Sequence, residues 1–206
     1  MLLEVHPDNP GERNIKIVVE CLLDGGVIIY PTDTVYALGC DITMVKAVER
    51  VARIKGVKLD KANFSLICSS LSQLADYTRP INNHIFRVMK RVLPGPYTFI
   101  LNANNNVPRV FQSKKKTVGI RNPNHLVPIR LVEHLGNPIM TTSIHHEDEI
   151  IDYLTDPIDI YERFNNLVDI VIDSGHGGLI PSTIVNCTTD ELIIVREGLG
   201  DPGLLE

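Results

Sequence analysis

Short β-rich runs alternate with segments of helical periodicity through the first half of the chain, and such runs follow one another more closely in the second half. The helical spacing is clear at residues 11–23, where Ile15, Val18 and Leu22 lie three or four positions apart. A β-rich run at 27–30 comes next and ends at Pro31. Because the later strands cluster, this order predicts an α/β fold with one mixed, twisted sheet flanked by helices, rather than a strictly parallel sheet.

The same patterns locate the remaining elements. Further helices are expected at residues 44–54 with Thr43 as the N-cap, at the leucines 71 and 74, at 83–92 and at 127–135. Further strands are expected at residues 64–68, 97–102, 117–121, 139–143, 169–173, 183–187 and 192–196, the last two as a hairpin. Since no repeat or linker interrupts these elements, we expect a single domain over residues 1–206 with its core at about 13–200.

The composition excludes several classes of protein. With 206 residues, 44% of them hydrophobic and 22% charged, the chain is neither disordered nor fibrous. No apolar run approaches the roughly 20 residues of a membrane span, and the first residues do not resemble a secretory signal, so we expect a cytoplasmic protein without a membrane partner. The four cysteines form no C-x-x-C pair, which favours reduced, mostly buried thiols.

Local charge matters more than net charge here. The formal net charge of -5 does not attract nucleic acid, so any polyanion would need a basic patch. One candidate is the stretch Lys114, Lys115, Lys116 and Arg121, and another is Arg87, Lys90 and Arg91, although a charged run is more commonly a solvated face.

The common catalytic motifs are absent. The chain contains no phosphate loop, no dinucleotide-binding glycine motif and no nucleophile elbow. The run 145–148 (HHED) suggests a metal site, but adjacent residues of an extended chain point to opposite sides, so no metal is expected. The run 175–178 (GHGG) allows two interpretations, a nest of N–H groups for an anion or a flexible turn.

The most informative segment is residues 31–40, PTDTVYALGC, directly after a buried strand. Two threonines, an acid and a tyrosine lie there at the carboxyl end of the strand, where open α/β sheets bind ligands. The alternative is a capped turn that leads into the helix at 44–54.

Five phrases then occur in a fixed order over essentially the whole chain. They are PTDTVYALGC after GGVIIY, PGPYTFIL, TVGIRNPNH, PSTIV and IVREG, with a lysine at the end of the helix after the first. Together they resemble the YrdC/YciO family. The resemblance implies an α/β domain with a concave, positively charged face. It also implies the family's activity, in which L-threonine, bicarbonate and ATP form threonylcarbamoyl-adenylate for tRNA modification, with Mg²⁺ accompanying the ATP.

The resemblance also implies roles for individual residues. Thr34 and Tyr36 would form the amino-acid pocket, Arg121 would hold the carboxylate of threonine, and Ser182 would lie beside it. Catalysis would depend on positioning and on cations, chiefly Lys55 and Arg121, rather than on a nucleophile. The residues expected near the nucleotide are Lys55, Lys58, Asn63, Thr117, Ser143 and Arg196.

Three departures from the family pattern resemble its YciO branch. Val57 replaces the arginine of the K-x-R pair, unless Lys58 or Lys61 substitutes for it. His145 replaces the asparagine of S-x-N, and Cys68 replaces a histidine. They leave an alternative open, a non-catalytic module that binds tRNA, double-stranded RNA or a nucleotide on the same basic face, with Lys114, Lys115 and Lys116 contributing. Carbamoyl transfer from carbamoyl phosphate is disfavoured, because the extra domains of that class are not seen.

Overall fold

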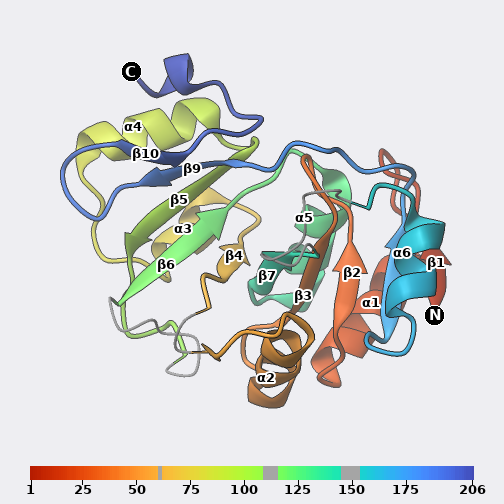
Figure 1. The fold of residues 1–206 in the computed structure, drawn as a ribbon. Coiled ribbons are helices and arrows are strands. Elements are labelled where there is room, and N and C mark those ends of the chain that lie inside the picture. The colour runs from red at the N-terminus through yellow and green to blue at the C-terminus, as the bar shows by residue number, and fades with distance from the viewer. Residues whose placement is uncertain (60–61, 109–115, 145–153) are drawn as a thin grey trace.

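The computed structural model describes residues 1–59, 62–108, 116–144 and 154–206. The described strands are β1 (Leu2–Glu4), β2 (Ile28–Tyr30), β3 (Ala37–Asp41), β4 (Ser65–Ile67), β5 (Tyr97–Asn102), β6 (Thr117–Arg121), β7 (Ile139–Ser143), β8 (Ile170–Asp173), β9 (Thr183–Asn186) and β10 (Ile193–Arg196). The described helices are α1 (Glu12–Leu23), α2 (Val45–Ile54), α3 (Leu71–Ala75), α4 (Asn83–Val92), α5 (Leu126–Leu135), α6 (Pro157–Phe164) and the short 3-10 helix η2 (Pro202–Leu205). Figure 1 shows the helices arranged around the central strands.

All ten strands form one sheet, in the order β1-β8-β2-β3-β7-β4-β6-β5-β9-β10. The pairs β1–β8, β2–β8, β4–β6 and β5–β9 are parallel, and the other five are antiparallel. The predicted mixed α/β sheet is therefore confirmed, as is the C-terminal hairpin of β9 and β10. No described helix is long and apolar enough to cross a bilayer.

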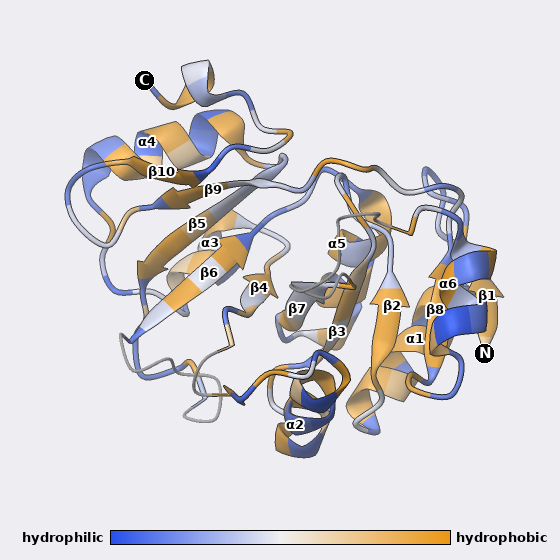
Figure 2. Cartoon of the chain, in the orientation of Figure 1, coloured by the Kyte–Doolittle hydropathy of each residue, from blue (hydrophilic) through white to orange (hydrophobic). Residues whose placement is uncertain are grey.

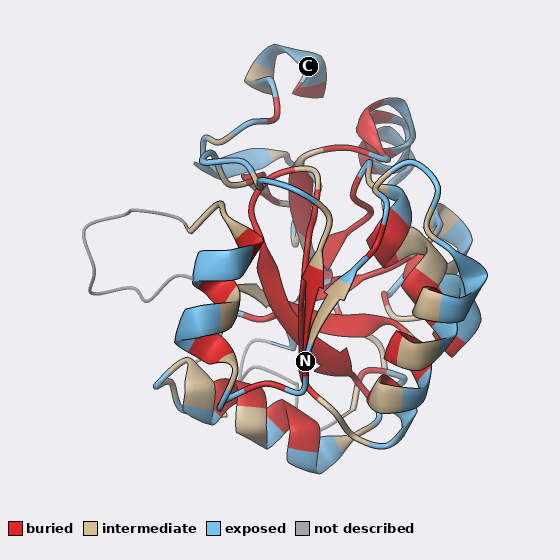
Figure 3. Cartoon of the chain, turned by 90° about the vertical axis from the view of Figure 1, so that its right-hand side faces the viewer, coloured by how far each residue is buried: buried red, intermediate tan, exposed pale blue. Residues whose placement is uncertain are grey.

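Alternate residues of the strands belong to two separate hydrophobic cores, one on each face of the sheet. On one side of the sheet, α1 and α5 pack together over Ile28, Tyr30 and Ile172. On the other side, Ile29 and Val171 join the larger core, to which α2, α4 and α6 contribute. Figure 3 shows the central strands buried and the outward helix faces exposed, and Figure 2 shows the hydrophobic residues gathered on strands such as β2 and β3. This alternation follows from the two-residue period of a strand.

Strand β3 overlaps the segment 31–40, where the apolar pattern predicts no strand. All five of its residues are buried, so it lacks the alternation that marks a half-exposed strand. Gly39 is required there, because a Cβ atom would lie 2.6 Å from the carbonyl oxygen of Met140 on β7. Close packing between strands therefore selects small residues at the cost of β propensity.

The prediction of Thr43 as an N-cap is wrong. The cap position of α2 is Met44, and no side chain caps this helix. The backbone N–H and the hydroxyl of Thr43 instead donate to Oδ1 of the buried Asp41, each at 2.8 Å. Strand β1 and helix α6 were not predicted, although Asp156 caps α6 and Pro157 begins it, as at many helix starts.

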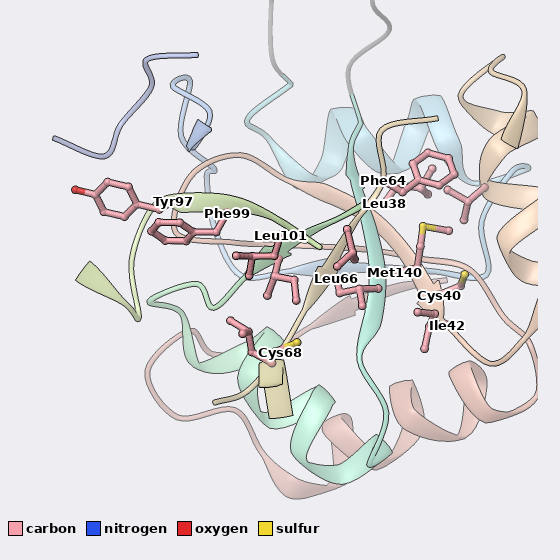
Figure 4. Close-up of a cluster of buried hydrophobic side chains, with 14 of the residues drawn as sticks. Leu38, Cys40, Ile42, Phe64, Leu66, Cys68, Tyr97, Phe99, Leu101 and Met140 are labelled. Atoms are coloured by element: carbon pink, nitrogen blue, oxygen red, sulfur yellow. The ribbon is translucent and has the colours of Figure 1, made fainter. Parts of the chain in front are cut away.

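The cysteines are free thiols, and three of the four are buried, as predicted. Figure 4 shows Cys40 and Cys68 among the apolar side chains of the larger core. Burial raises the pKa of the Cys68 and Cys187 thiols to about 12. These thiols therefore stay neutral in the folded protein at a pH where the unfolded chain ionises them.

This difference makes the folded protein sensitive to alkali. Because the folded pKa values are raised, the stabilisation is complete below pH ~8.5 and is lost as the pH rises toward about 12. Urea unfolding at pH 8 to 11 should show a fall of roughly 1.4 kcal/mol per pH unit for each such thiol. Cys187→Ala should flatten the profile, whereas an equally steep fall in that variant would contradict the explanation.

Candidate functional site

A cavity of about 620 Å³ opens where the loop after β2, the C-terminal end of α2 and six strands meet. The strands are β3, β4, β5, β6, β7 and β9, and β10 adds Arg196. Several of the strand residues that line the cavity carry a hydroxyl, although their neighbours along the strand belong to the hydrophobic core. Thr98, for example, lies between the buried core residues Tyr97 and Phe99.

Eight of the residues singled out in the sequence line this one cavity. They are Thr34, Lys55, Lys58, Asn63, Arg121, Ser143, Ser182 and Arg196. Two others do not line it. Tyr36 is fully buried and its hydroxyl donates to the carbonyl oxygen of Gly175 at 2.7 Å, while Thr117 lies at the start of β6. Of the basic run, Lys116 is exposed, and Lys114 and Lys115 lie outside the described residues, as does His145.

Positive charge dominates the cavity. Lys55, Lys58, Arg121 and Arg196 line it, and its described lining residues include no carboxylate. Two of the cations are held in place by backbone carbonyls: Lys55 Nζ donates to Ser143 at 3.0 Å, and Arg196 Nη2 donates to Ser182 at 2.8 Å. Such a wall attracts an anionic ligand.

Arg121 is the most deeply buried of these cations, with 7% of its surface exposed. Its Nη2 donates to Asp33 Oδ1 and to Thr34 Oγ1, both at 2.9 Å. Its Nε–H has no hydrogen-bond partner among the described residues, although it is buried. A buried donor without a partner costs free energy, so this N–H is suited to a ligand acceptor. Because both Nη2 hydrogens are occupied, a carboxylate here would meet Nε–H rather than a fork that includes Nη2.

Asp33 ties two loops together around this arginine. Its Oδ1 accepts from Arg121, and its Oδ2 accepts from the backbone N–H of Asn124 at 2.9 Å. The ion pair is buried on both sides, with 9% of the arginine side chain and 8% of the aspartate side chain exposed. Asp33 therefore fixes the guanidinium relative to the loop after β2.

The run Gly175–Gly178 packs against the back of that loop. A Cβ atom on Gly178 would lie 2.2 Å from the carbonyl oxygen of Thr34, and one on Gly177 would lie 2.7 Å from the ring of Tyr36. Gly175 has a φ of 86°, in the left-handed region that favours glycine. The glycines thus allow close backbone approach behind Thr34, a reason that neither sequence interpretation of this run contained.

A second cavity of about 590 Å³ lies on the other side of the loop, and Asp33, Thr34, His125 and the glycine run line it. Burial lowers the pKa of His125, which keeps its imidazole neutral over a wider range of pH. Thr34 lines both cavities, so the loop is the wall between them.

Thr32 and Asp33 lie inside the motif singled out in the sequence, but the family resemblance implied individual roles there only for Thr34 and Tyr36. The signal that could have identified them is their position directly before Thr34, a residue already expected to bind the ligand. The partners of Asp33, Arg121 and Asn124, are about ninety positions away, so these contacts were not visible in the chain. Thr32 instead bonds locally, to Thr34 and Val35.

The described lining residues of the cavity offer no protein site for Mg²⁺. Magnesium prefers carboxylate and phosphate oxygens, and the described lining residues include no carboxylate. Within residues 1–59, 62–108, 116–144 and 154–206, no group of three or more His, Cys, Asp or Glu could hold a metal ion. Any magnesium would therefore have to come with the phosphates of a ligand.

The mixed sheet and its cationic cavity define a class of protein: an α/β protein whose basic, hydroxyl-lined cavity suits a small anionic ligand. Comparison with known proteins gives the family. The model of the Sua5/YciO/YrdC family, described as "Telomere recombination", matches residues 20–198. The chain belongs to this family, which confirms the resemblance seen in its motifs.

Two kinds of relative are similar to this chain. The uncharacterized protein YciO of Escherichia coli is 43% identical over 198 residues, which cover 96% of this chain and 95% of that protein. A threonylcarbamoyl-AMP synthase of Coxiella burnetii is 30% identical over 182 residues, which cover 88% of this chain and 96% of the synthase. Relatives in the family therefore include enzymes of threonylcarbamoyl-AMP synthesis.

Solved structures give the same picture. The crystal structure of Escherichia coli YciO matches with a TM-score of 0.93 and 40% identity, covering 100% of this chain and 99% of that one. The Sua5 protein of Pyrococcus abyssi, in complex with L-threonine, matches with a TM-score of 0.87 and 28% identity. That match covers 96% of this chain and 57% of Sua5.

Proposed function

We propose that this protein binds MgATP and L-threonine in the larger cavity and acts as a threonylcarbamoyl-AMP synthase or a slow relative of one, linked to tRNA modification. The observation that carries the proposal is the convergence of Arg121, Lys55, Lys58 and Arg196 on one hydroxyl-lined cavity. The synthases among its relatives, and the L-threonine complex of Sua5, support the choice of ligands.

The proposed chemistry needs no nucleophilic side chain. The amine of L-threonine adds its lone pair to the carbon of bicarbonate and water leaves, which gives the N-carbamate. A carbamate oxygen then attacks the α-phosphorus of ATP and pyrophosphate departs. Positioning and stabilisation of the developing negative charge carry such a reaction, and a preformed cationic wall supplies both.

The lining residues divide between the two proposed ligands. In this proposal the Nε–H of Arg121 and the hydroxyls of Thr34 and Ser182 would hold the amino acid. Lys55, Lys58, Asn63, Ser143 and Arg196 would face the nucleotide, with Mg²⁺ arriving on its phosphates.

The test is release of pyrophosphate. The pure protein with MgATP, bicarbonate and L-threonine should release pyrophosphate in proportion to enzyme, and omission of L-threonine should reduce the release to background. Lys55→Ala should lower the rate by a factor of about 100, because it removes one charged contact from the transition state. Turnover without L-threonine, or no turnover at high enzyme concentration, would reject synthase activity.

One observation favours the alternative of binding without synthesis. Val57 lies in the cavity wall, at the position where the synthases of the family carry an arginine, and valine cannot hold a phosphate. Calorimetry separates the two functions. Tight MgATP or tRNA binding that L-threonine does not change would indicate a binding module, whereas mutual enhancement of the two ligands would support the synthase.

A further inference from the structure

The loop after β2 contains a chain of hydroxyls whose direction follows from counting protons. Thr32 Oγ1 lies 2.7 Å from the carbonyl oxygen of Val35, and a carbonyl can only accept, so the single hydroxyl proton of Thr32 is donated there. Thr32 Oγ1 also accepts from the backbone N–H of Thr34 at 3.1 Å. This oxygen can therefore enter one further bond, as an acceptor.

That further bond is the 3.0 Å contact between the Thr32 and Thr34 hydroxyls. Since the Thr32 proton is already used, Thr34 has to be the donor. Thr34 Oγ1 in turn accepts from Arg121 Nη2 at 2.9 Å. The Thr34 hydroxyl then donates its only proton to Thr32 and keeps one lone pair that no described residue uses. The residue is 1% exposed and lines the cavity.

We infer that Thr32 is a positioning residue that makes Thr34 a pure acceptor, so that the cavity recognises a hydrogen-bond donor of its substrate. Beside this acceptor lies the opposite polarity, the partnerless Nε–H of Arg121. The pair therefore matches a ligand that carries an anionic acceptor and a donor close together. A hydroxy amino acid has both.

This inference rests on the proposed function and names the substrate group that Thr34 would read. In the proposed reaction the amine gives up its lone pair to bicarbonate, so its bonding changes during the reaction. The side-chain hydroxyl of L-threonine is the donor that the reaction leaves unchanged. We therefore assign the free lone pair of Thr34 to that hydroxyl.

The test compares L-threonine with O-methyl-L-threonine, whose side-chain oxygen accepts but cannot donate. Calorimetry in the presence of a non-hydrolysable ATP analogue gives the ratio of the two affinities for each variant. Thr32→Val frees the Thr34 proton, which can then turn to an acceptor, so the ratio should fall by about tenfold relative to wild type. Thr32→Ser keeps the hydroxyl and should keep the wild-type ratio. The bulk of the added methyl group cancels, since it is the same in every variant.

An unchanged ratio in Thr32→Val would overturn the inference. If that variant does not fold, neutron diffraction of the wild-type protein locates the hydroxyl deuterium of Thr34. A deuterium on the line to Thr32 supports the inference, and one directed into the cavity overturns it. Failure of the wild-type protein to bind L-threonine at all would instead count against the proposed function, and the neutron result would still decide the polarity of Thr34.

Discussion

Arg121→Ala should abolish measurable L-threonine binding and lower the free energy of unfolding by about 3–5 kcal/mol. The first effect follows from loss of a guanidinium that lines the cavity and whose buried Nε–H has no partner among the described residues. The second follows from the carboxylate that is left without its counter-ion. Asp33 has 8% of its side chain exposed and would keep a buried carboxylate without its counter-ion. Calorimetry and urea unfolding measure the two effects independently.

A double variant separates stability from binding. Arg121→Ala with Asp33→Ala removes both charges, so part of the lost stability should return, because a buried pair contributes less than the penalty for breaking it. Binding should not return. Recovery of L-threonine binding in the double variant, or binding within twofold of wild type in the single variant, would show that Arg121 does not hold the ligand.

Gly178→Ala should damage the site although Gly178 does not line the larger cavity. The added methyl group would meet the carbonyl oxygen of Thr34 at 2.2 Å, so the loop after β2 has to move. Overpacking of this kind costs about 1–3 kcal/mol of stability. L-threonine affinity should fall by at least about tenfold, because Thr34 shifts relative to Arg121, and MgATP affinity should change less.

The matched control is Gly203→Ala, where the added Cβ atom would come no closer than 3.3 Å to a side-chain oxygen of Asp201. This variant should behave like wild type in both titrations. A Gly178→Ala protein with wild-type affinity for L-threonine would contradict this prediction, because the added methyl group would then be accommodated without a shift of Thr34.

Apolar periodicity predicted every described helix except α6 and the short η2, and every strand except β1 and β3. The two strands escaped prediction for different reasons. Strand β1 has three residues and finds its partner, β8, near the other end of the chain. Strand β3 is buried on both faces and is held by contacts with β2 and β7, so its local sequence, rich in small residues, lacks the pattern of a strand.

The sequence predicted which side chains form the site better than it predicted the hydrogen bonds that orient them. Motifs predicted the cationic and hydroxyl side chains, and eight of the residues named for the site line one cavity. Their orientation depends on bonds such as Asp33 to Arg121, which join positions 88 residues apart and leave no local pattern. Tyr36 is an example, because only the fold shows that its hydroxyl donates to the carbonyl oxygen of Gly175.

The pairing of β1 has a consequence for the order of assembly during translation. Leu2–Glu4 hydrogen-bonds only to Ile170–Asp173 within the sheet, and the amino group of Met1 donates to the carbonyl of Asp169. Residues 2–4 therefore have no strand partner until residues 170–173 have been synthesised. The β1 edge of this sheet can form only after β3, β4, β5, β6 and β7 of the cavity wall have been synthesised, whereas β9 and β10, which complete that wall, follow later still.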